Sequence, residues 1–75
     1  MTIQARWWKE RHHTYLPNGA AIRAERERVG MSQRELAERS GFSPMYICDI
    51  EHERRTVPEQ TLVAVVRALA AKEEG

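Results

Sequence analysis

The sequence has 75 residues, which is enough for one small domain and too few for two. Its twelve Lys and Arg residues nearly cancel its eleven Asp and Glu residues, so the net charge of +1 does not by itself indicate a nucleic-acid partner. No apolar run reaches the roughly 18 residues of a membrane span, and the N-terminus "MTIQARWWKE" lacks the apolar core of a signal peptide.

Residues 1–17 form an N-terminal extension whose structure the sequence leaves open. Ile3 and Trp7 are four positions apart, which permits a short helix, while a strand or an irregular arm fits equally well. We expect Trp7 and Trp8 to cover a core or a dimer surface rather than to stack on bases. The two tryptophans also make the extension a candidate surface for a protein partner.

Four helical segments, and no strand, are predicted from the sequence. The first segment starts after Asn18, a residue type that caps helices, and stops at Gly30. Ile22 and Val29 lie at helical spacing on the same face, and Arg26 occupies the same face between them. The first helix therefore has only a modest apolar stripe.

The next two helices each begin with a residue that can cap the chain. Ser32 opens the sequence "SQRE", a capping box in which Ser32 accepts from the Glu35 amide and Glu35 reaches back. Gly41 ends this second helix. Ser43 caps the third helix, and Pro44 takes the first helical position, where its missing N–H is not needed.

The last helix is predicted from about residue 58 to residue 71. An apolar stripe at spacings i, i+3, i+4 and i+7 supports it, formed by Leu62, Val65, Val66 and Leu69. Only a few residues separate neighbouring helices, so sequential helices are expected to pack on one another.

The stretch "SQRELAERSGFSPMYICDI" holds the residues that two helices need to cross at a sharp angle. Ala37 is small enough for the second helix to approach, and Gly41 tolerates the positive φ of the turn. Ile47 and Ile50 supply the apolar clamp. Counted from Gln33 as one, these four residues are fifth, ninth, fifteenth and eighteenth. This spacing predicts a helix-turn-helix.

The segment from about residue 19 to 69, above all "MSQRELAERSGFS" and "IEHERR", resembles the Cro/C1-type (XRE-like) helix-turn-helix domain of phage repressors and bacterial transcription regulators. The resemblance implies an all-α, lambda-repressor-like domain of four helices, or five if the extension adds one. It also implies a dimer that binds operator DNA. The family pattern normally continues into a fifth helix that often helps dimerisation, and this helix is expected to be missing after "AAKEEG".

The expected organisation is an extension or arm at residues 1–17, a helix-turn-helix domain at 18–71 and a charged tail at 72–75. In this motif the second helix enters the major groove by its N-terminal end, and the first helix crosses the DNA backbone. The resemblance places base contacts at Pro44, Met45 and Asp49, and phosphate contacts at Gln33, Ser43 and Tyr46. The predicted DNA-binding set is completed by Arg34, Arg54 and Arg55.

The outer face of the predicted reading helix lacks Arg, Lys, Asn and Gln, the usual hydrogen-bonding readers of bases. Met45 or Pro44 can contact a thymine methyl group. Asp49 either accepts from a cytosine amino group or pairs with Arg54 or Arg34. Readout is therefore expected to depend on phosphate contacts and DNA shape more than on base hydrogen bonds.

The sequence predicts a DNA-binding transcription regulator, a repressor or small controller protein, that binds a palindromic operator as a homodimer. A bacterial or phage-encoded cytoplasmic protein on the nucleoid is expected, because the lone Cys48 suits a reducing setting. The alternative is a protein-interaction module, antitoxin-like or accessory, that keeps the fold with little direct DNA readout. The acidic and apolar reading face motivates this alternative.

No nucleophile with a matched histidine and no Gly-rich phosphate loop appears, so the sequence does not predict an enzyme. No cofactor is expected. The histidines do not have the spacing of a zinc site. Cys48 has no basic residue beside it in the sequence and is expected to be a quiet structural thiol.

Overall fold

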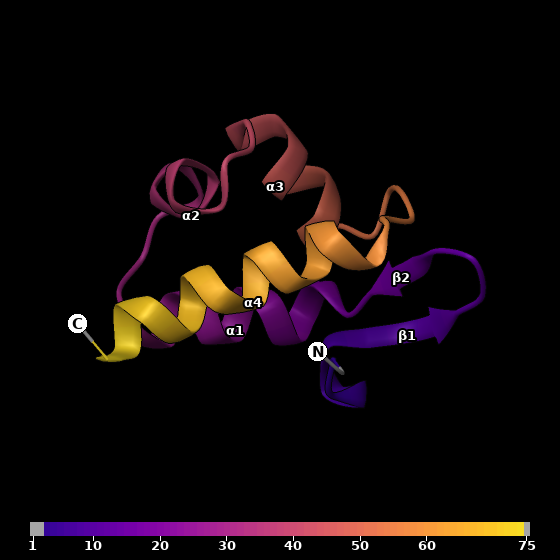
Figure 1. Cartoon of the computed structure of the whole chain (residues 1–75). Coiled ribbons are helices and arrows are strands. Elements are labelled where there is room, and N and C mark those ends of the chain that lie inside the picture. Colours follow the sequence, from indigo (N-terminus) through magenta and orange to yellow (C-terminus); the bar gives the residue numbers. More distant parts are fainter. Residues whose placement is uncertain (1–2, 75) are drawn as a thin grey trace.

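The computed structural model describes residues 3–74. Its elements in chain order are a 3-10 turn η1 (Ala5–Trp7), strands β1 (Trp8–Arg11) and β2 (Tyr15–Pro17), and helices α1 (Gly19–Arg28), α2 (Gln33–Ser40), α3 (Pro44–Glu51) and α4 (Glu59–Glu74). Helices α1 and α4 run alongside each other, α2 and α3 lie over them, and the hairpin extends from the end of the molecule where α4 begins (Figure 1). The predicted four-helix architecture is confirmed.

The three predicted helix caps are present. Asn18, Ser32 and Ser43 each accept a hydrogen bond from the amide three residues later, at 3.1, 3.0 and 3.1 Å. The predicted return bond from Glu35 to Ser32 is not formed. The Glu35 carboxylate accepts instead from Lys72 of α4 at 3.1 Å, because a cation from another helix offers a stronger partner than a backbone amide.

Among residues 3–74 the structure contains two strands, both within residues 1–17, where a strand was one of the conformations left open; none was among the segments predicted from the sequence pattern. Strands β1 and β2 pair antiparallel with Trp8 opposite Pro17 and a register shift just after Trp8. These strands have only four and three residues, which is too short for the alternation of apolar and polar residues that marks a strand in a sequence. A two-stranded hairpin is marginal alone, and this one is held by Tyr15, which exchanges two 2.8 Å backbone hydrogen bonds with Val57.

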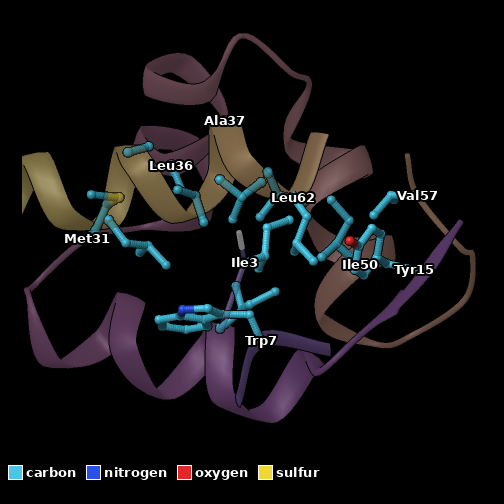
Figure 2. Close-up of a cluster of buried hydrophobic side chains, with 14 residues drawn as sticks. Ile3, Trp7, Tyr15, Met31, Leu36, Ala37, Ile50, Val57 and Leu62 are labelled. Atoms are coloured by element: carbon cyan, nitrogen blue, oxygen red, sulfur yellow. The ribbon is translucent and has the colours of Figure 1, made fainter. Parts of the chain in front are cut away.

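The core lies between the two helical layers and the extension (Figure 2). Leu62, Val65 and Leu69 of the predicted α4 stripe are buried, while Val66 is half-buried. Ile47 and Ile50, predicted to clamp the motif, are also buried, as are the small residue Ala37 and its neighbour Leu36. The predicted stripe of α4 is therefore buried at three of its four positions, and the predicted clamp of the motif is confirmed.

The extension packs into this core. Ile3 and Trp7 are 5% and 4% exposed, which confirms the expectation that Trp7 covers a core. Trp8 is half-buried and meets the Tyr15 ring edge-on, with 5.8 Å between ring centroids. A chain of this size buries a small core, so these aromatic side chains form a substantial part of it.

Helix α4 continues beyond the predicted end at residue 71 and includes residues expected to form a charged tail, up to Glu74. The contact of Lys72 with Glu35 and that of Glu73 with Arg28, at 2.6 Å, hold this last turn to α2 and α1. Residue 75 of the expected tail lies outside the described residues. No helix within residues 3–74 combines the length and apolar character needed to cross a bilayer.

Candidate nucleic-acid interface

A glycine turn fixes the angle between α2 and α3. Gly41 has φ 84° and ψ 24°, a left-handed conformation that glycine adopts without steric cost. Its amide and that of Phe42 both donate to the Ala37 carbonyl at 2.9 Å, which satisfies the end of α2. Ala37 itself is fully buried where the two helices meet. The predicted elbow is thus confirmed at the backbone level.

The leading end of α3 projects from this elbow. Ser43, Pro44 and Met45 are exposed there. Met45 is 70% exposed, and it is the one large apolar side chain that stands exposed in the described part of the chain. Tyr46 is half-buried, because its ring packs on Phe42 with 4.9 Å between centroids. An apolar side chain thus stands at the tip, beside a fixed aromatic ring.

Asp49 is engaged by the two arginines that follow α3. Its two carboxylate oxygens accept from Arg54 Nη1 at 3.2 Å and from Arg55 Nη2 at 3.1 Å. The carboxylate raises the pKa of Arg54 above its usual value through this hydrogen bond. The Arg55 guanidinium also lies 4.8 Å from the centroid of the Tyr46 ring. These contacts gather two positive charges at one side of the tip.

Of the two protein partners that the sequence suggested for Asp49, the structure forms the pair with Arg54 and adds Arg55. Arg34 pairs instead with Glu38 on its own helix, at 3.5 Å. Each oxygen of Asp49 already accepts one hydrogen bond and the side chain is 15% exposed, so a cytosine amino group has to share this carboxylate with the two arginines. Both arginines are about half exposed and keep N–H groups free for another acceptor.

The expectation that Cys48 has no basic neighbour is wrong. Arg54 Nη1 lies 3.7 Å from Cys48 Sγ, and His52 Nδ1 lies 3.5 Å from the same sulfur. His52 lies one helical turn after Cys48, a spacing that the sequence does show, whereas Arg54 reaches the sulfur because the chain after α3 folds back along the helix. No group of three or more His, Cys, Asp or Glu side chains that could hold a metal ion occurs among residues 3–73.

A buried ion pair behind the interface is the feature that sequence reasoning missed. Arg26 Nε donates to Glu51 Oε2 at 2.6 Å and Nη2 donates to Oε1 at 3.1 Å. Arg26 Nη1 also donates to the Met31 carbonyl at 2.8 Å. The predicted phosphate ligand Gln33 joins this network, because its Nε2 donates to Glu51 Oε1 at 3.1 Å. A charged residue on the apolar stripe of α1 was the available signal.

The basic residues of the extension do not form a free arm. Arg6 stacks over Trp7 at 4.3 Å from the ring centroid, and Lys9 pairs with Glu53 at 2.8 Å. Arg11 lies at the end of β1, 6.0 Å from the centroid of the Tyr15 ring. The extension is thus bound to the helical domain over most of its described length.

Residues 22–74 match the Helix-turn-helix family, and this match covers both helices of the motif together with α4. The chain belongs to the Cro/C1-type helix-turn-helix family of DNA-binding domains. The hairpin and η1 precede the matched residues.

Relatives of this helix-turn-helix domain include proteins described as transcription regulators. Two uncharacterised HTH-type transcriptional regulators of Mycobacterium tuberculosis, from strains CDC 1551 and H37Rv, are each 38% identical over 56 residues. The match spans 75% of this chain and 40% of each relative. The crystal structure of the clp gene regulator ClgR from C. glutamicum superposes with a TM-score of 0.66 at 42% identity, covering 69% of this chain and 68% of that chain.

Proposed function

We propose that this helix-turn-helix domain acts in transcription regulation, as a repressor or small controller protein that binds a palindromic operator as a homodimer. The observation that carries the proposal is the exposed leading end of α3, mounted on the Gly41 elbow with Arg54 and Arg55 beside it. This is the arrangement that places a reading helix in the major groove and its flanks on the phosphates. The similarity to the transcriptional regulators of Mycobacterium tuberculosis and to the clp gene regulator ClgR supports a regulatory function.

The phosphate contacts in this proposal surround the tip of α3. The residues assigned to them are Gln33, Arg34, Ser43, Tyr46, Arg54 and Arg55. Gln33 is suited to this because its amide donates one hydrogen to Glu51 and retains a second for a phosphate oxygen. Ser43 stands at the N-terminus of α3, where backbone amides and the helix dipole favour an anion.

The base contacts are assigned to Pro44, Met45 and Asp49. Met45 and Pro44 offer apolar surface to thymine methyl groups, and Met45 has the greater reach because its side chain is long and exposed. Asp49 accepts from a cytosine amino group with the lone pairs that its two arginines leave free. We therefore propose that DNA shape and phosphate contacts supply much of the selectivity.

A homodimer follows from the proposed operator. A two-fold axis between protomers presents two α3 tips to half-sites about one helical turn apart, roughly 34 Å. We place the protein in the cytoplasm of its bacterial host, where the operator lies.

Selection of bound fragments from a random DNA pool tests the proposal. We expect enriched fragments to carry an inverted repeat whose half-site centres lie about 10 base pairs apart, or a multiple of one helical turn. Met45→Ala should then enrich a different base at the contacted position. A pool that gives no enrichment, or a site without internal symmetry, would contradict the palindromic operator.

One observation favours a second candidate function. The exposed part of α3 presents Met45 and a carboxylate already bound by arginines, a surface that suits an apolar protein partner as well as DNA. A protein-interaction module would use this surface in place of DNA. A competition experiment separates the two functions. A partner protein that binds at Met45 and displaces DNA supports both DNA binding and protein interaction. A partner that binds to a protein without any DNA affinity supports the protein-interaction module alone.

A further inference from the structure

The hairpin holds the segment between α3 and α4, residues 52–58, which we call the arginine loop because it carries Arg54 and Arg55. The backbone of Tyr15 in β2 and that of Val57 in this loop exchange two hydrogen bonds of 2.8 Å. Both side chains are buried. An isolated antiparallel bridge therefore ties the two-stranded hairpin to the loop, and Figure 1 shows β2 beside the loop at the start of α4.

A second tether joins the same two segments through Glu53. Its Oε1 accepts from Lys9 Nζ at 2.8 Å, and its Oε2 accepts from the Gly19 amide at 2.9 Å. One side chain thus connects β1, the first turn of α1 and the arginine loop. The hydrogen bond from Lys9 lowers the pKa of Glu53, so the carboxylate is charged at neutral pH.

The backbone at Glu53 is held in a conformation that favours glycine. Glu53 has φ 58°, and it is the one non-glycine residue with positive φ in the described part of the chain. Its amide donates to the Ile50 carbonyl at 3.1 Å, and the next amide, of Arg54, donates to the Asp49 carbonyl at 2.9 Å. This pair of bonds is the Schellman ending of a helix, in which the left-handed position is usually glycine.

A glutamate in this position costs backbone strain that a glycine would avoid. Strain of this kind persists where the surroundings fix the residue, and it concentrates at functional sites. The feature that glycine would lack is the side chain, which forms the tether to Lys9 and Gly19. The residue with the strained backbone is therefore also the residue whose side chain forms the tether.

We propose that Glu53 is a positioning residue, which together with the hairpin fixes the arginine loop so that Arg54 and Arg55 are ordered before DNA arrives. The inference rests on the proposed function, because it assigns these arginines to the DNA backbone. Ordering side chains and loops on binding costs free energy, and a loop ordered in advance avoids that cost. Since phosphate contacts carry no sequence information, the benefit applies equally to every DNA sequence.

The substitution Glu53→Gln gives a test in which a positioning role and the mere loss of a negative charge predict opposite changes in DNA affinity. Removing a negative charge beside a phosphate-facing loop should by electrostatics alone tighten DNA binding. Glutamine keeps a single acceptor oxygen, so it can hold only one of Lys9 and Gly19. Loss of the other bond should instead weaken binding to selected and unselected DNA alike, by about three- to tenfold, as expected for one ordinary hydrogen bond. Glu73→Gln is the charge-matched control, since Glu73 pairs with Arg28 at the opposite end of α4.

A second variant and a second measurement keep folding separate from positioning. Glu53→Gly suits the observed φ and so retains the turn, but it lacks the tether, and we expect the same weakening of DNA binding. Amide hydrogen exchange should quicken at Arg54 and Val57 in both Glu53 variants and stay unchanged in Glu73→Gln. Unfolding curves taken alongside confirm that the compared proteins are folded.

Three results overturn the inference. Tighter or unchanged DNA binding in Glu53→Gln excludes positioning, and so does unchanged exchange at Arg54 and Val57. Weakening of equal size in Glu73→Gln assigns the effect to a general loss of stability and not to positioning. If the unsubstituted protein binds no DNA at any salt concentration, the proposed function fails, and the exchange measurement alone then decides whether Glu53 holds the loop.

Discussion

Arg26 and Glu51 form an ion pair behind the recognition surface, with Arg26 Nε 2.6 Å from Glu51 Oε2 and both residues 9% exposed. The pair joins α1 to the last turn of α3, so it fixes the far end of the reading helix. Gln33 of α2 donates to the same carboxylate. Three helices thus meet at one buried charge, and the orientation of α3 depends on that charge remaining compensated.

Removing one partner of this pair should destabilise the fold strongly. We expect Arg26→Met to lower the free energy of unfolding by about 3–5 kcal/mol, because Glu51 would be left buried without its cation. Urea denaturation measures this loss. Arg23→Met is the matched control: Arg23 lies one turn earlier, and its pair with Glu27 is exposed on both sides, so it should change stability by less than about 1 kcal/mol. Equal losses in the two variants would contradict the buried network.

Two glycines should respond to alanine in different ways. At Gly41 an added Cβ meets nothing within 4 Å, so Gly41→Ala should cost about 1 kcal/mol, from the positive φ alone. At Gly19 an added Cβ would lie 1.9 Å from the Glu51 carbonyl oxygen, and the backbone of α1 or α3 must move. We expect Gly19→Ala to cost about 3 kcal/mol in urea unfolding. The reverse ranking would show that α1 and α3 do not approach as closely as described.

Arg55 should supply affinity without sequence preference. Arg55→Ala removes one phosphate contact, so binding should weaken about equally for all DNA sequences, and the slope of log K against log salt should become shallower by about 0.9. Arg23→Ala removes the same charge from the exposed side of α1, beside the C-terminal end of α3 and not its leading end, and should leave the slope unchanged. A loss confined to one DNA sequence would show that Arg55 contacts a base.

Met45 should contribute to the preference for an operator base and not to the stability of the fold. Because its side chain is 70% exposed, Met45→Ala should change the free energy of unfolding by less than about 0.5 kcal/mol. The preferred operator base should change, since an apolar contact with a thymine methyl group is lost. Comparison of the sites selected by the two proteins from a random pool measures this. Identical sites would remove Met45 from the reading surface.

Acidification should weaken the fold through carboxylates bound to cations. Lys72 lowers the pKa of Glu35, and Lys9 lowers that of Glu53, so the folded state binds protons more weakly than the unfolded chain. Their contribution is present above the unfolded pKa of about 4.3 and is lost as pH falls through the lower folded values. Tm should therefore fall from about pH 5 towards pH 3. Glu53→Gln should show a shallower fall, and a parallel curve would contradict the role of Glu53.

The parts of this molecule that the sequence predicted have local signals. Ser32 and Ser43 sit three residues before the amides they cap, and Gly41 lies within the turn that it makes. The buried stripe of α4 repeats within one helix. Each of these features can be recognised in a short window, so the four helices and the elbow of the motif followed from the sequence.

The parts that the sequence did not predict join residues that are distant in the chain. Arg26 and Glu51 are 25 residues apart, and Lys9 and Glu53 are 44 apart. No short window contains both members of either pair. The conformation of the extension was left open for the same reason, because the bond partner that stabilises Tyr15 belongs to the loop after α3. In each case the tertiary fold, and not local propensity, decides the structure.

The central claim is that the leading end of α3 enters duplex DNA while the residues around it neutralise phosphates. Titration of labelled operator DNA at several salt concentrations tests it most directly. The account predicts a straight line of log K against log salt with a slope of about −0.9 for each phosphate contact, hence steeper than about −3 for several contacts. A slope near zero, or no binding at low salt, would contradict it.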